Sequence, residues 1–320
     1  MVLSQWVVDA LVSSLVAACV TITVSLLVHF CGGVVGGALG TVPHVAVVGS
    51  IGFSLQLSAT SLSFQTAMLV MPIGMLNNSF YLAGLRVFSL HYGGGFGGKS
   101  SEMGRMLRAF FCSGTVFLVI LALVVFFLKP ETLPLATLQI LAVASFFAEF
   151  LVGVLLIVYF PSAPSTEAET TGEDGGEKDD IRSKVWAFMG RGACTFVLFF
   201  VALALAQTLP ALSGILVNLP IIGTVVVSSL WLSESKEVAL STLAPMVLGM
   251  LSASLYAIIA SFFMPGGVAS GAIASWCMSV FCVTCPVVYF LEKRRKARVP
   301  QNAVELEFSS HIKESTTVNV

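Results

Sequence analysis

Residues 109–128 read AFFCSGTVFLVILALVVFFL, twenty residues without a single charge. A helix of about 20 apolar residues is long enough to cross the hydrocarbon core of a bilayer. Similar runs recur along the 320-residue chain and predict nine membrane-spanning helices, at 6–30, 34–57, 62–87, 105–128, 136–160, 185–207, 211–232, 238–263 and 268–291. The composition agrees, since 57% of the residues are hydrophobic and 10% are charged, against about 25% charged in an average soluble domain. We therefore expect an all-α integral membrane protein and exclude a water-soluble one.

The positions of the basic residues predict the orientation in the membrane. The cluster Lys293-Arg294-Arg295-Lys296 directly follows the last predicted span, and cytoplasmic loops are enriched in Lys and Arg. With nine spans, the same side receives the loops that carry Lys99, Lys178 and Lys236, whereas the opposite side receives Lys129. The N-terminus is therefore expected outside or in a lumen, and the C-terminus in the cytoplasm. The formal net charge of −1 implies no basic surface for nucleic acid.

Two segments are too polar to lie in the membrane. The first, residues 161–184, is acidic and rich in Pro, Gly, Ser and Thr, which is typical of a disordered linker. The second is a tail that ends in Val318-Asn319-Val320, a form that a domain binding C-terminal carboxylates could recognise. The expected organisation is a first membrane repeat (1–135), a connecting span (136–160), a cytoplasmic linker (161–184), a second membrane repeat (185–291) and a cytoplasmic tail (292–320).

An internal repeat connects the two predicted halves. Residues 74–81 read GMLNNSFY and residues 249–256 read GMLSASLY, so that Gly, Met, Leu, Ser and Tyr agree at five of eight positions. Upstream, Pro43 precedes Gly74 by 31 residues and Pro220 precedes Gly249 by 29 residues. The repeat therefore relates the second predicted span to the seventh and the third to the eighth.

The offset between the related spans determines their relative direction. It is five spans, an odd number, so related helices cross the membrane in opposite directions. Inverted repeats of this kind are typical of secondary transporters, whose substrate sites lie near the bilayer midplane. The alternative is that the duplication only built a stable bundle, because channels and some scaffolds also contain inverted repeats.

Two prolines predict interruptions in the second and seventh spans. Proline removes a backbone donor and breaks or kinks a helix, and two half-helices that meet at midplane can direct backbone groups at one solute. The predicted substrate-binding pocket is formed by Thr41, Pro43, His44, Asn77, Asn78, Asn218 and Pro220. The alternatives are an ordinary proline kink, a histidine that only packs, and asparagines that only join helices.

A charge near the bilayer centre is costly and needs a specific reason. Glu149 falls in the middle of the fifth predicted span, and Arg191 lies about two turns into the sixth. One interpretation is a buried structural ion pair between these two residues. The other makes Glu149 a proton-coupling or cation site, with His44 as a proton relay.

Two further motifs carry less weight. Residues 93–100 read GGGFGGKS and match the phosphate-loop pattern, but they follow a membrane span where such a loop needs a strand, and no nucleotide-binding domain fits in this short loop. Cys282 and Cys285 form a lone C-x-x-C inside an apolar helix, where buried free thiols are the default. We expect no metal, no cofactor and no enzymatic activity.

The sequence therefore predicts a multi-pass transporter that moves a small molecule or ion by alternating access, either coupled to protons or not. The alternatives are a channel-like pore and a membrane scaffold or receptor without transport. The expected partners are the substrate and the lipid bilayer, and a homo-oligomer is compatible with the sequence.

Overall fold

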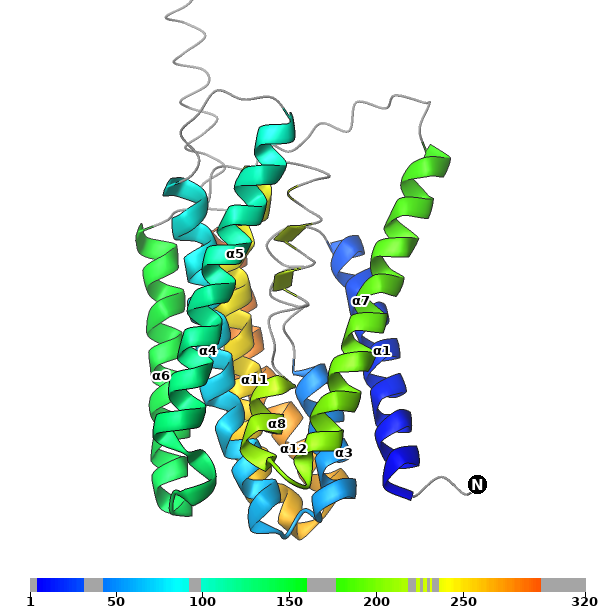
Figure 1. Ribbon diagram of the computed structural model, residues 1–320, viewed down its shortest axis with the longest axis vertical. Coiled ribbons are helices and arrows are strands. Elements are labelled where there is room, and N and C mark those ends of the chain that lie inside the picture. The colour runs from blue at the N-terminus through cyan, green and yellow to red at the C-terminus, as the bar shows by residue number, and fades with distance from the viewer. Residues whose placement is uncertain are drawn as a thin grey trace, which may run out of the picture.

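The computed structural model describes residues 5–31, 43–91, 99–159, 177–217, 223–224, 227–228, 231 and 236–294. All regular elements in these residues are helices, and they form an elongated bundle (Figure 1). The long helices are α1 (Gln5–Cys31), α4 (Leu62–His91), α5 (Lys99–Leu123), α6 (Leu135–Tyr159), α7 (Glu177–Ala206), α11 (Leu243–Phe263) and α12 (Val268–Ser279). The short ones are α3 (His44–Leu57), α8 (Pro210–Leu216) and α10 (Lys236–Ser241).

Shorter helical pieces extend or connect these elements. A π-helical segment, Val124–Leu128, continues α5, and another, Val280–Thr284, continues α12 before a helical stretch that ends at residue 294. The 3-10 turns Pro130–Thr132 and Met264–Gly266 precede α6 and α12.

Six of the helices are long and apolar enough to cross a membrane: Gln5–Thr23, Leu62–His91, Met103–Thr132, Leu135–Tyr159, Ala239–Gly266 and Val268–Arg294. They coincide with the first, third, fourth, fifth, eighth and ninth predicted spans, and they confirm a multi-pass membrane protein. The second and sixth predicted spans contain shorter apolar helices, His44–Leu57 and Gly192–Ala206. The seventh coincides with α8 and then enters residues that are mostly outside the described part.

The central helices are buried on nearly all sides, and the outer helices expose large apolar side chains. α4 and α11 pack against each other in the middle of the bundle, and α6 contacts both of them. On the outside, Phe126 and Phe127 after α5 are 71% and 82% exposed. Such exposure would cost free energy in water, so it matches a surface that faces lipid.

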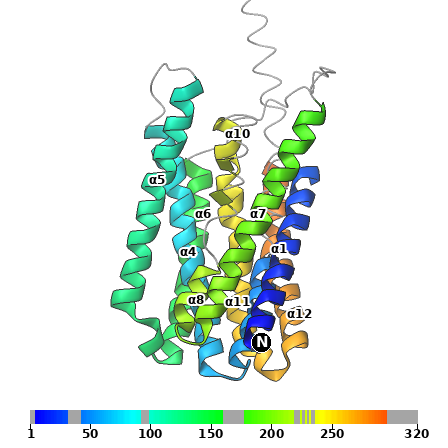
Figure 2. The same ribbon diagram turned by 45° about the vertical axis from the view of Figure 1, so that its right-hand side comes forward.

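The helices of the two predicted halves make similar contacts. α1 packs against α3, and α7 packs against α8. α1 and α7 also contact each other, as α4 and α11 do. Figure 2 shows α1 beside α7, with α11 behind them.

One end of the bundle gathers the short connections. The turns at 58–61, 129–134, 207–209 and 264–267 all lie at the end where α1 begins (Figure 1). These turns contain one basic residue, Lys129. Lys236 and Arg294 donate hydrogen bonds to the carbonyls of Ser89 and Ile157, near the opposite ends of α4 and α6. α7 begins at Glu177, inside the range predicted as a linker, and residues 160–176 lie outside the described part.

Candidate functional site

Among the residues whose side chains the structure describes, Glu149 is the charged residue that is fully buried. It sits near the midpoint of α6, and its side chain is 0% exposed. Ser254 of α11 donates a hydrogen bond to its Oε2 at 2.5 Å, and Ser79 of α4 approaches its Oε1 at 3.4 Å. The first distance is typical of a strong bond to a carboxylate, and the second is longer than an ordinary hydroxyl bond. The carboxyl group therefore joins α6 to the two central helices α4 and α11, and α11 holds it more tightly than α4 does.

Ser79 and Ser254 occupy the same position in the repeated block, and so do Tyr81 and Tyr256 two residues later. Residues two apart on a helix point in nearly opposite directions. The serines face α6, whereas the tyrosines face the second and seventh predicted spans. Both α4 and α11 therefore direct a serine hydroxyl at Glu149 and a tyrosine hydroxyl at a proline-interrupted span.

The two tyrosine hydroxyls make equivalent bonds across the halves. Tyr256 of α11 bonds Ser50 of α3 at 2.6 Å, and Tyr81 of α4 bonds Thr224 at 2.7 Å. The Ser50 hydroxyl donates its own hydrogen to the carbonyl of Val47 at 2.8 Å. Because a serine has one hydroxyl hydrogen, Tyr256 is the donor to Ser50.

Sequence reasoning missed Ser50, Thr224 and the four serines and tyrosines of the repeat. A serine inside a span usually bonds the carbonyl of its own preceding turn, so its type alone indicates no site. The serines and tyrosines of the repeat could have been predicted from their identity at equivalent positions of the repeated block, Ser79 with Ser254 and Tyr81 with Tyr256.

Asn77 and Asn78 use their amide nitrogens to join α4 to its neighbours. Asn77 Nδ2 donates to the carbonyl oxygen of Phe117 on α5 at 3.1 Å, and Asn78 Nδ2 contacts the sulfur of Met250 on α11 at 3.3 Å. Their Oδ1 atoms are buried, and no described residue donates to them. The nitrogens thus act between helices, while the oxygens are acceptors that a polar solute could use.

The rest of the predicted pocket is described only in part. α3 begins at His44, directly after Pro43, so a helix does start at the predicted interruption. Pro43 is buried, and His44 is half-buried. Thr41, Asn218 and Pro220 lie outside the described residues, so the assembled pocket stays a prediction.

The predicted ion pair between Glu149 and Arg191 also stays a prediction. Arg191 belongs to α7, but its side chain is outside the described part. The next residue, Gly192, packs against Ile22 of α1. The described partners of the Glu149 carboxylate are the two serines. Among the described residues, no group of three or more His, Cys, Asp or Glu side chains is placed to hold a metal ion.

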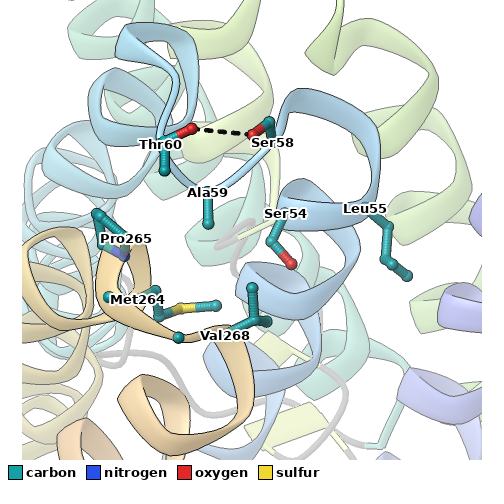
Figure 3. A pocket seen from close by; sticks show the side chains of 10 residues that line it. Ser54, Leu55, Ser58, Ala59, Thr60, Met264, Pro265 and Val268 are labelled. Carbon is teal, nitrogen blue, oxygen red and sulfur yellow. Dashed lines mark hydrogen bonds between the residues drawn. The ribbon is translucent and has the colours of Figure 1, made fainter.

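A cavity of about 460 Å³ opens where the α3–α4 turn meets the α11–α12 turn. Its walls include Ser54, Ser58 and Thr60 on one side and Met264 and Val268 on the other. Figure 3 shows the Met264 side chain extending towards Val268, with Ser54 beside them. The Ser58 and Thr60 hydroxyls are bonded to each other at 3.1 Å.

Comparison with known protein families, curated proteins and solved structures gives no match for this chain.

Proposed function

We propose that the protein is a secondary transporter that moves a small solute by alternating access and couples this movement to protons at Glu149. The observation that carries the proposal is the fully buried Glu149 carboxyl group, which two serines from equivalent repeat positions hold between α4 and α11. An ionisable residue at membrane depth indicates a functional site by default.

The contact pattern supports an inverted repeat. Each half contributes a first helix packed on a second, and a third helix that reaches the connecting helix α6. The two tyrosine bonds are also related, since each one joins the third-type helix of one half to the second-type span of the other. Two copies of one unit, related by a two-fold axis near Glu149, would produce these pairs. Because the axis would lie in the membrane plane, motion of one half could expose the centre to either side in turn.

Glu149 has the chemistry that proton coupling requires. As an anion it accepts hydrogen bonds from Ser254 and Ser79, and one proton on either oxygen makes it neutral. A neutral group crosses or faces hydrocarbon at lower cost than a charged one. The carboxyl group can therefore bind a proton on one side and release it on the other as the halves move.

The unequal serine distances fit one end state of such a cycle. Ser254 lies close to Glu149 and Ser79 lies further away, so the two halves are not placed symmetrically about the carboxyl group. In the opposite end state, Ser79 would take the short bond. The solute would bind at the predicted pocket of Thr41, Pro43, His44, Asn218 and Pro220, with the Oδ1 atoms of Asn77 and Asn78 as acceptors.

The experiment that tests the proposal is solute-dependent proton flux. Purified protein is reconstituted into liposomes with a pH-sensitive dye inside, and glycerol, a hexose and neutral amino acids are added in turn under an imposed pH gradient. The intact chain should show a saturable proton flux with at least one of these solutes, and Glu149→Gln should abolish it. Glu131→Gln is the matched control, because Glu131 is exposed in the turn before α6.

The contradicting results are equally specific. A solute-dependent proton flux that survives Glu149→Gln would refute coupling at this residue. A flux that does not saturate would identify a pore. No flux of protons or solutes in the intact chain would point to a scaffold or receptor.

A further inference from the structure

No ionisable side chain is among the described residues that line the cavity at the α3–α4 and α11–α12 turns. Its polar groups are the hydroxyls of Ser54, Ser58 and Thr60 and the backbone of Gly266 and Gly267. Hydroxyls both donate and accept hydrogen bonds, so they can replace the water around an uncharged polar molecule. A charged solute would lose its hydration there without gaining a counter-charge, which is costly.

A stripe of hydroxyls leads from this cavity into the bundle. Ser58, Ser54 and Ser50 are spaced by four residues, so they lie on one face of α3 and at its end. Ser58 and Ser54 line the cavity, and Ser50 is fully buried, with its hydroxyl on that of Tyr256. Ala46 lies on the same face of α3, one turn before Ser50 and close to the start of the helix.

The facing helix has a matching stripe. Met264, Ala260 and Tyr256 also follow a spacing of four residues. Met264 lines the cavity, and all three pack in one buried cluster with Ala46 of α3. Because Ala260 is small, the first bulky group along this stripe beyond the cavity is the Tyr256 ring.

The equivalent stripe of the other half is filled differently. The repeat aligns Leu85 with Ala260, as it aligns Tyr81 with Tyr256. Leu85 is fully buried and packs in one cluster with Val227 and Trp231. At this aligned position, the other half therefore has a bulky leucine, whereas the half beside the cavity has a small alanine.

From these observations we infer that the cavity is the entry chamber for an uncharged polar solute, and that the Ser50–Tyr256 hydrogen bond is the barrier on its inner side. This inference rests on the proposed transport function and names its substrate class. In this conformation, the path from the cavity is open at the end of the bundle where α1 begins and is closed at Tyr256.

The barrier is tested by a ladder of single cysteines along α3: Ser58→Cys, Ser54→Cys and Ala46→Cys. Reconstituted full-length protein is treated with a membrane-impermeant methanethiosulfonate, and labelling is read peptide by peptide, so that native cysteines are resolved separately. Ser58→Cys and Ser54→Cys should react, and Ala46→Cys should be protected.

Loss of the barrier should expose the protected position. In a Tyr256→Phe background, Ala46→Cys should react about tenfold faster, because the ring is then no longer held across the path by its hydroxyl bond to Ser50. Ser50→Ala removes the same bond from α3 and should have the same effect. Tyr289→Phe is the control, since Tyr289 is exposed on the last helical stretch. Fast labelling of Ala46→Cys with Tyr256 intact, or continued protection in both barrier variants, would overturn the inference.

The substrate class is tested by the charge of the probe. At Ser54→Cys, a neutral hydroxyethyl methanethiosulfonate should react faster than its cationic trimethylammonium and anionic sulfonate analogues, by about tenfold after correction for their rates with a free thiol in solution. Equal corrected rates, or a preference for one charged probe, would refute a chamber for uncharged solutes. These labelling results do not depend on flux, so a chamber without transport gives the full labelling pattern and no solute-dependent proton flux.

Discussion

At the scale of single residues, the account depends on hydroxyl groups that bond across helices rather than within one. The Ser254 hydroxyl reaches Glu149 on α6, whereas the Ser261 hydroxyl on the same helix bonds the carbonyl of Ile258 in its own turn. Sequence alone cannot separate these two cases, because it does not fix the rotation of a helix about its axis. Glu149 could be predicted because a buried charge is rare. The residue type of its serine partners indicates no site, since serine is common in spans, and only their identity at equivalent positions of the repeat could have found them.

Removing the Ser254 hydroxyl should weaken the contact between α4, α6 and α11 at Glu149. Ser254→Ala takes away the shorter bond to Glu149, and an interhelical hydrogen bond in a membrane protein contributes up to about 1.7 kcal/mol. We expect a lower Tm in detergent than for the unchanged chain, with a smaller decrease for Ser79→Ala. Ser261→Ala is the matched control on α11 and should change the Tm least. An equal effect of Ser254→Ala and Ser261→Ala would contradict the cross-helix role of Ser254.

At the scale of elements, hydropathy predicted most helices to within a few residues. The run 136–160 corresponds to Leu135–Tyr159, and the run 62–87 to Leu62–His91. The run 34–57 can be compared only from Pro43 onward, because residues 34–42 lie outside the described part. There, α3 begins at His44 and has 14 residues, and it starts directly after the proline that predicted an interruption. Hydropathy alone does not register such a start, because an interrupted span is as apolar as a continuous one.

The packing of α8 against α4 gives a prediction at this scale. A Cβ at Gly214 would collide with the carbonyl oxygen of Ala67, which belongs to the rigid backbone of α4. Gly214→Ala should therefore force the helices apart and lower the free energy of unfolding by about 1–3 kcal/mol. Gly114→Ala on α5 is the control, because nothing lies within 4 Å of its new methyl group. There the helix should be stabilised slightly. Thermal unfolding in detergent measures both, and equal stability of the two variants would show that α8 does not pack as described.

At the scale of the whole molecule, the repeated block and the parity of the spans predict two opposed copies of one unit. In the structure, α1 pairs with α7 and α4 pairs with α11, and α6 packs against the second of these pairs. The sequence could not predict the cavity at the turn between α11 and α12, because that cavity depends on how the folded helices pack.

The orientation of the bundle can be tested directly. A small epitope tag inserted between Glu131 and Thr132 should be reached by antibody from outside the cytoplasm, because that turn lies at the end with few basic residues. A tag after Val320 should be reached only from the cytoplasmic side, since the basic cluster follows the last span. If both tags were reached from the same face of the membrane, the chain would not cross an odd number of times between the two tags, which would contradict the predicted topology.

The central claim is that the two halves open in alternation about Glu149. It is tested most directly by comparing the labelling of Ser54→Cys on the cavity side with that of Val227→Cys, which packs in one cluster with Leu85 in the other half, each with Glu149 and with Glu149→Gln. Since the glutamine imitates the neutral carboxyl group, the account predicts that one cysteine becomes more reactive and the other less. Labelling that rises or falls at both positions together, or changes at neither, would contradict alternating access.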